Sequence, residues 1–155
     1  MSACQRDDAR DVRVRLAKWF DLDRQIYFTS LARCTVAVYA VKEIDPRESL
    51  AVTDTPKEAA KAFRNAEVIG IRMADYSPND LTDAMLLDGD GAFGKEALRA
   101  GARSVDCMRG SFVEGHLRTA LTRVGATLVF DKATEAVIVL DPVQERLYFI
   151  AGDVL

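Results

Sequence analysis

The last third of the chain contains three short apolar runs, which cover residues 126–131, 136–141 and 146–151. Two polar segments, KATE and PVQE, separate these runs and have the composition of turns. Runs of this length, rich in β-branched and aromatic residues and joined by short turns, are typical of antiparallel strands that follow one another along the chain. The pattern therefore predicts a three-stranded C-terminal meander.

Both faces of this meander are apolar. Because alternate side chains of a strand point to opposite faces, each strand supplies residues to both. We assign to one face Leu128, Phe130, Ile138, Leu140, Leu147 and Phe149, and to the other Val129, Val137, Val139, Tyr148 and Ile150. An antiparallel sheet with one face in water is usually polar on that face. We therefore expect a second layer or a partner chain to cover the second face, and a homodimer follows as a hypothesis.

The middle of the chain alternates strand and helix patterns. Residues 34–41, CTVAVYAV, form a continuous apolar run that is typical of a strand buried on both faces, and IYFTS just before it is a weaker strand candidate. SLAVT reads as a short strand and EVIGIRM as another, with a helix that begins at TPKE between them. A strand, a helix and a strand in this order predict one parallel crossover unit.

Apolar residues at helical spacing predict further helices. The first covers residues 6–20, with Asp11 and Arg15 as an ion pair one turn apart. Another begins at SPND, a third is KEALRAG closed by Gly101, and a fourth covers residues 111–125, where Ser111 and Glu114 fit a capping box. The whole pattern predicts a single α+β domain over residues 1–155, with a mixed or mostly antiparallel sheet and helices packed on one face.

The segment LLDGDGAFGKEAL carries the one motif that suggests chemistry, Gly89-x-Gly91-x-x-Gly94 followed by Lys95. The spacing resembles the glycine-rich loop of protein kinases, but the lysine strand and the catalytic loop of that family do not follow it. It also matches the dinucleotide-binding fingerprint, which requires a strand immediately before the loop. Here the preceding residues have helical spacing, and the carboxylates of Asp88 and Asp90 would repel a pyrophosphate.

Two other interpretations of this segment remain. An EF-hand register with Gly91 at its sixth position places Leu86 and Ala97 where carboxylates are needed. A looser Mg²⁺ or Ca²⁺ site would use Asp88 and Asp90, with Asp83 or Glu96. The interpretation we favour is structural, because Gly89 would end one helix and Asp90 would cap the next without any ligand.

Few other side chains suggest catalysis. His116, the single histidine, lies at the edge of the apolar stripe of residues 111–124, so we expect a partly buried packing residue and keep a general base as the alternative. The three cysteines, Cys4, Cys34 and Cys107, are far apart and form no zinc-binding pattern. We expect them to be reduced, with a nucleophilic Cys107 beside His116 as a minor alternative.

Composition narrows the function only slightly. The net charge of −3 disfavours nucleic-acid binding, the N-terminus is polar and charged without the apolar core of a signal peptide, and no apolar run is long enough for a membrane span. We therefore expect a non-catalytic regulatory or binding protein in the cytoplasm, which acts through protein contacts or a small-molecule pocket and forms a homodimer. The alternative is a small enzyme that depends on a divalent cation, or a nucleotide-binding protein, built on the loop from Gly89 to Lys95.

The candidate ligand-binding residues at this stage are Asp88, Asp90, Lys95 and His116. No catalytic residue and no set of metal ligands is assigned, and the sequence leaves the cofactor open. We expect no nucleic-acid partner and no membrane partner.

Overall fold

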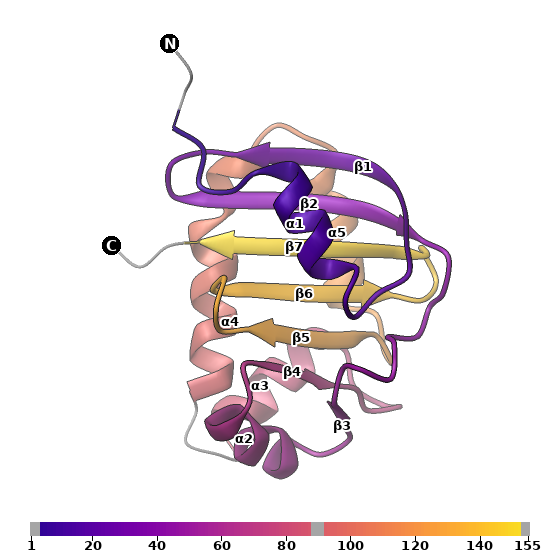
Figure 1. Cartoon of the computed structure of the whole chain (residues 1–155). Coiled ribbons are helices and arrows are strands. Elements are labelled where there is room, and N and C mark those ends of the chain that lie inside the picture. The colour runs from indigo at the N-terminus through magenta and orange to yellow at the C-terminus, as the bar shows by residue number, and fades with distance from the viewer. Residues whose placement is uncertain (1–3, 88–91, 153–155) are drawn as a thin grey trace.

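A single seven-stranded sheet organises the chain. The computed structural model describes residues 4–87 and 92–152. The strands are β1 (Leu22–Ser30), β2 (Cys34–Val41), β3 (Val52–Thr53), β4 (Val68–Ile71), β5 (Thr127–Asp131), β6 (Ala136–Asp141) and β7 (Arg146–Gly152). Their order across the sheet is β1-β2-β7-β6-β5-β4-β3 (Figure 1). Every neighbouring pair is antiparallel except β3 and β4, so the prediction of a mixed, mostly antiparallel sheet is confirmed.

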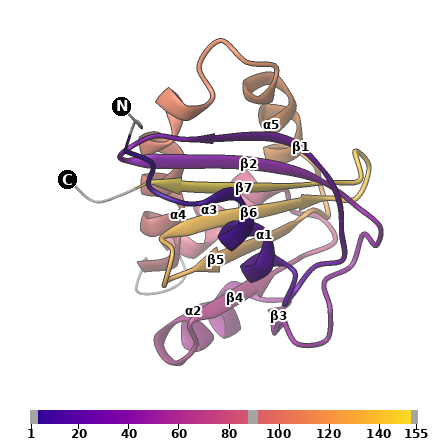
Figure 2. The same cartoon turned by 45° about the horizontal axis from the view of Figure 1, so that its top comes forward.

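Helices lie on both sides of this sheet, but unevenly. The helices are α1 (Ala9–Leu16), α2 (Pro56–Asn65), α3 (Pro78–Leu87), α4 (Ala92–Arg103) and α5 (Val113–Leu121), with a 3₁₀ turn η1 (Val105–Cys107) between the last two. Helices α2 to α5 pack on one side, here called the helical face, as predicted. Helix α1 crosses the opposite side, here called the α1 face, in front of β2, β7 and β6 (Figures 1 and 2).

The C-terminal meander is confirmed as β5, β6 and β7, but the faces assigned to β5 are wrong. Leu128 lies opposite Val139, and Phe130 lies opposite Val137. Directly opposed residues of an antiparallel pair share a face, so Leu128 and Phe130 point to the helical face and Val129 to the α1 face. Alternation shows which residues of one strand share a face. The register with the neighbouring strand decides on which side of the sheet that face lies.

Both faces of the meander are covered from within the chain. Val12 and Leu16 of α1, followed by Phe20, are buried against the α1 face. There they pack in one cluster with side chains of β6 and β7 such as Ile138 and Phe149. The other face, for which a second layer or a partner chain was expected, carries Val137, Val139, Tyr148 and Ile150, and these pack in one cluster with residues of α2 to α5. The second layer is therefore part of the chain, and this face no longer calls for a partner chain. The homodimer stays a prediction without this support.

Helix α1 is shorter than the predicted helix 6–20, because Asp8 caps it by accepting hydrogen bonds from the backbone N–H groups of Arg10 and Asp11. The expected pair of Asp11 with Arg15 is replaced by a longer-range one. Arg15 instead forms a two-pronged ion pair with Asp131 at the end of β5, with Nε–Oδ2 at 2.5 Å and Nη2–Oδ1 at 2.8 Å. The Asp131 side chain is fully buried, and its hydrogen bond to Arg15, together with its charge, raises the pKa of Arg15 above the ordinary value.

The parallel crossover is confirmed as β3, α2 and β4. Thr55 caps α2 by accepting from the backbone N–H of Glu58, as the TPKE pattern predicts. At the start of α3, Asp80 accepts from both the backbone N–H and the hydroxyl of Ser77, and its own N–H donates to the Ser77 hydroxyl. These bonds form a reciprocal capping box and lower the pKa of Asp80.

The expectation of three reduced cysteines is wrong. Cys34 of β2 and Cys107 of η1 form a disulfide, although 73 positions separate them in the sequence, and both are buried. Cys4 is free and exposed. The prediction of a reduced compartment rested on unpaired cysteines, so the cytoplasm is now a prediction without that basis, and Cys107 is not available as a nucleophile.

The helices around η1 also differ from their predicted bounds. Helix α4 continues past Gly101 to Arg103, and α5 begins at Val113. The Ser111 hydroxyl accepts from the backbone N–H of Val113. Gly125 lies beyond the end of α5 with φ at 84°, a left-handed conformation that favours glycine.

Candidate functional site

The glycine motif lies between two helices. Helix α3 ends at Leu87 and α4 begins at Ala92, so the segment before the loop is a helix and the dinucleotide interpretation lacks its strand. The caps expected at Gly89 and Asp90, and the ligand role expected for Asp88 and Asp90, fall in residues 88–91, which lie outside the described residues. Lys95 is exposed on α4 and makes no hydrogen bond or ion pair with any described residue.

Gly94, the last glycine of the motif, has a structural role. A Cβ atom at this position would lie 2.7 Å from Cγ of Leu86 and 2.9 Å from the backbone oxygen of Thr82, both in α3. The backbone of α3 cannot yield as a flexible side chain would, so α3 and α4 approach this closely only with glycine at position 94. The glycine motif therefore contains at least one residue that close helix packing requires.

This packing role predicts opposite effects for two Gly→Ala substitutions in helices. Alanine favours a helix over glycine by about 1 kcal/mol, but at position 94 the added methyl would overpack the contact with α3, at a cost of about 1–3 kcal/mol. We expect Gly94→Ala to lower the free energy of unfolding by about 1 kcal/mol. We expect Gly115→Ala in α5 to raise it, because a Cβ there meets no atom within 4 Å. Chemical denaturation of both variants measures this, and a stabilised Gly94→Ala variant would contradict the packing role.

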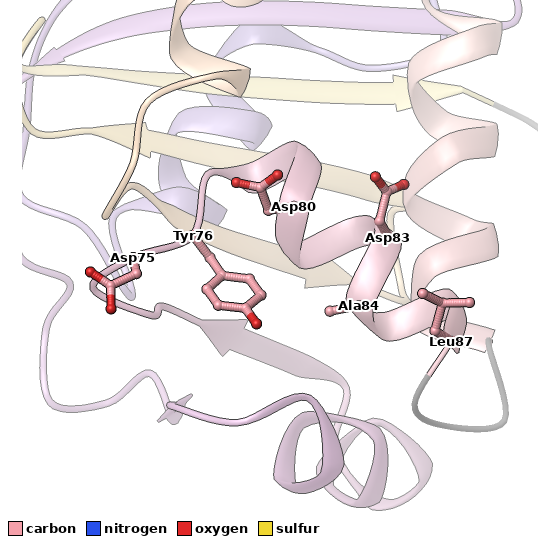
Figure 3. A pocket seen from close by; sticks show the side chains of 6 residues that line it. All are labelled: Asp75, Tyr76, Asp80, Asp83, Ala84 and Leu87. Atoms are coloured by element: carbon pink, nitrogen blue, oxygen red, sulfur yellow. The ribbon is translucent and has the colours of Figure 1, made fainter.

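Carboxylates gather at the start of α3. A hollow of about 390 Å³, here called the acidic hollow, is lined by Asp75, Tyr76, Asp80, Asp83, Ala84 and Leu87. Figure 3 shows that the Asp75 carboxylate points away from those of Asp80 and Asp83. Among the described residues, no group of three or more His, Cys, Asp and Glu side chains is arranged to hold a metal ion. Asp80 is already engaged in the capping box with Ser77.

His116 lies on the exposed side of α5, where we expected a partly buried residue. It lines a shallow depression with Thr119, Gln144 and Arg146, here called the histidine hollow. Its Nδ1 lies 2.7 Å from Nη1 of Arg146, and its ring packs edge-on against Phe112. No described residue of α3 or α4 lines this hollow, so Lys95 and His116 do not share it.

A third depression lies over the meander on the helical face and is the most enclosed of the three. We call it the apolar cleft, and its volume is about 280 Å³. Three helices, the segment after η1 and three strands line it, with the residues Asn79, Thr82, Ala97, Leu98, Met108, Leu117, Leu121, Leu128, Val137 and Ile150. Asn79 and Thr82 are its polar residues, and no described residue that lines it is charged.

No family model, no curated protein and no solved structure matches this chain. Function must therefore be argued from the geometry of these three sites. In the described part of the chain, no helix has both the length and the apolar character needed to cross a membrane.

The apolar cleft was not among the sites that the sequence suggested. Its residues are apolar members of ordinary amphipathic stripes and strands, and they meet in space from segments up to 71 positions apart, such as Asn79 and Ile150. One signal in the sequence was Leu98, an apolar residue beside the polar face of a helix. The side chain is 54% exposed at the edge of the cleft.

Proposed function

We propose that this chain is a non-catalytic binding protein that holds a small, uncharged and mainly apolar molecule in the apolar cleft. The observation that carries the proposal is the lining of the cleft, where apolar side chains of α4, α5 and the meander converge without a charged residue among those described. Pockets that bind small molecules are typically concave and mostly apolar, with few polar groups.

The chemistry of the lining selects the class of ligand. A charged ligand would lose its hydration in the cleft without a described counter-charge to replace it, which is costly. An apolar ligand gains about 25 cal/mol for each Å² of apolar surface removed from water. The volume of about 280 Å³ lies just below the range for ligand pockets, roughly 300–1,000 Å³, and therefore favours a small molecule.

The two polar residues of the cleft suggest how such a ligand would be oriented. The Thr82 hydroxyl already donates to the backbone oxygen of Pro78 at 2.9 Å. The Asn79 side chain is exposed and makes no hydrogen bond with a described residue, so its amide can serve one polar group of a ligand. A mainly apolar ligand with a single hydroxyl or carbonyl group at one end fits this arrangement best.

A rim substitution tests the proposal without disturbing the core. N-phenyl-1-naphthylamine is an uncharged probe whose fluorescence rises in an apolar site, and we expect saturable binding to the native protein. Leu98→Gln removes apolar contact from the rim of the cleft, and losing about 1 kcal/mol of apolar contact weakens the affinity about fivefold. The matched control is Leu87→Gln in α3, because Leu87 is 83% exposed and does not line the cleft.

If the wild type and both variants bind the probe with equal affinity, the probe does not bind in the cleft, and the proposal is refuted. An equal loss in both variants would indicate a general effect of surface apolarity and would also contradict the proposal. Thermal melts of all three proteins without the probe check that the fold is intact.

The alternative function, a cation-dependent enzyme or nucleotide-binding protein that uses the loop from Gly89 to Lys95, stays a prediction. Melting curves recorded with Mg²⁺, Ca²⁺, ATP or NAD test it, because a ligand that binds the native state raises the melting temperature. A cytoplasmic location and a homodimer likewise stay predictions.

A further inference from the structure

We propose that the histidine hollow is a second binding site, one that takes a small oxyanion such as a phosphate or carboxylate group. The proposal is independent of the apolar cleft, because no described residue lines both sites. It rests on the hydrogen-bond donors that α5 and the start of β7 bring to one place.

The contact between Arg146 and His116 fixes which ring nitrogen carries the proton. A guanidinium group has N–H donors and no acceptor. Because its Nη1 lies 2.7 Å from His116 Nδ1, that nitrogen must accept, and the ring proton of the neutral imidazole is assigned to Nε2. The pair therefore offers N–H groups to a ligand, from Nε2 of the imidazole and from the rest of the guanidinium.

Arg146 carries a charge that no described carboxylate neutralises. It makes no ion pair with a described carboxylate, and besides His116 its guanidinium interacts with the neutral hydroxyl of Tyr148. The two carboxylates nearest to Arg146 in the sequence, Asp141 and Glu145, do not form an ion pair with it. Asp141 accepts from the backbone N–H groups of Val143 and Gln144 and lies 3.5 Å from Arg123, and Glu145 is exposed in the turn. An anion in the hollow would supply the missing partner of Arg146.

The donors are held in place before any ligand arrives. Gln144 donates from Nε2 to the backbone oxygen of His116 at 3.1 Å, and its Oε1 accepts from the buried Tyr148 hydroxyl. The His116 ring also packs against Phe112, with ring centroids 5.5 Å apart. A preorganised site loses less conformational entropy on binding. The N–H groups of a planar guanidinium and of the imidazole can each donate to a different oxygen of a phosphate or carboxylate group. Chloride has no set of oxygens, so it is less well suited to this arrangement.

The single histidine of the chain provides a direct readout, because the imidazole signals in an NMR spectrum of the untagged protein belong to His116 alone. Inorganic phosphate, acetate and chloride are titrated separately at constant ionic strength and pH. We expect a saturable shift of these signals with phosphate or acetate and no saturable shift with chloride. The oxyanion that saturates at the lower concentration identifies the ligand chemistry as phosphate or carboxylate.

Substitutions then separate a specific site from general charge attraction. We expect Arg146→Gln to weaken oxyanion affinity about tenfold, since charge-assisted hydrogen bonds are the stronger ones, and Arg146→Lys to retain part of it through its charge. Arg118→Gln is the matched control. Arg118 is exposed on α5, the helix that carries His116, and it does not line the hollow. It should leave the affinity unchanged.

Three results would overturn the site: shifts that do not saturate with either oxyanion, equal responses to chloride, or an equal loss of affinity in Arg118→Gln and Arg146→Gln. Because Arg146 also links β7 to α5, the backbone amide spectrum of Arg146→Gln is compared with that of the wild type. Where that variant alters the fold, Thr119→Tyr replaces it, since a bulky side chain at this exposed position fills the hollow. Unchanged oxyanion affinity in a folded Thr119→Tyr variant would also overturn the proposal.

Discussion

Replacing Cys34 and Cys107 together with alanine is expected to lower the free energy of unfolding by about 4 kcal/mol. The disulfide closes a loop across 73 positions, and a link of this length removes on the order of 4 kcal/mol of conformational entropy from the unfolded chain in the chain-entropy model. It also fixes η1 and the adjoining Met108, which lines the apolar cleft, against β2. Urea denaturation of the double variant measures the loss.

Cys4→Ala is the matched control and should leave the stability unchanged, because Cys4 is free and exposed. A thiol assay of the unfolded, unreduced protein should detect one thiol per chain, and three after reduction. Three thiols before reduction would show that the bond is absent. Equal stabilities of the double variant and the wild type would show that the bond does not constrain the chain.

Arg15→Met is expected to cost about 3 kcal/mol of stability. The substitution keeps the length of the side chain but leaves the buried Asp131 carboxylate without its counter-charge, and breaking a buried pair in this way typically costs about 3–5 kcal/mol. We expect the lower end of this range, because the backbone N–H of Ala133 and the hydroxyl of Thr134 still donate to Asp131. Denaturation at neutral pH measures the change.

Two companion variants separate the lost charge pair from lost packing. Arg13→Met removes an arginine from the same helix, one that donates to the backbone oxygen of Asp23, and it should cost less than about 1 kcal/mol. Adding Asp131→Asn to Arg15→Met should recover part of the loss, since the unpaired buried charge is then gone. If Arg13→Met and Arg15→Met destabilise the protein equally, the pair with Asp131 does not anchor α1.

Much of the fold follows from local patterns. The meander follows from three apolar runs and two short turns, and the crossover of β3, α2 and β4 follows from the cap at Thr55 between two strand patterns. The face of Leu128 was wrong because alternation within β5 does not reveal its register with β6. The cover provided by α1 was also missed, because its apolar stripe does not say which side of the sheet it meets.

The sites depend on long-range contacts that one sequence does not reveal. Cys34 and Cys107 pair only because β2 and η1 meet on the helical face. The apolar cleft joins α3 to β7, and the histidine hollow joins α5 to the turn that follows β6. The sequence did single out His116 and the glycine motif. The structure gives His116 a partner in Arg146 and gives Gly94 a close contact with α3.

The central claim is that the apolar cleft binds a small apolar molecule, and nuclear Overhauser effects between the bound probe and protein methyl groups test it most directly. With N-phenyl-1-naphthylamine bound, we expect contacts to the methyl groups of Leu117, Leu128 and Val137, all of which line the cleft. Leu16 and Ile138 serve as internal controls, because they lie on the opposite face of the sheet. Contacts to the three cleft residues and none to the two controls would support the claim. Saturable binding with contacts outside the cleft, or no binding at all, would contradict it.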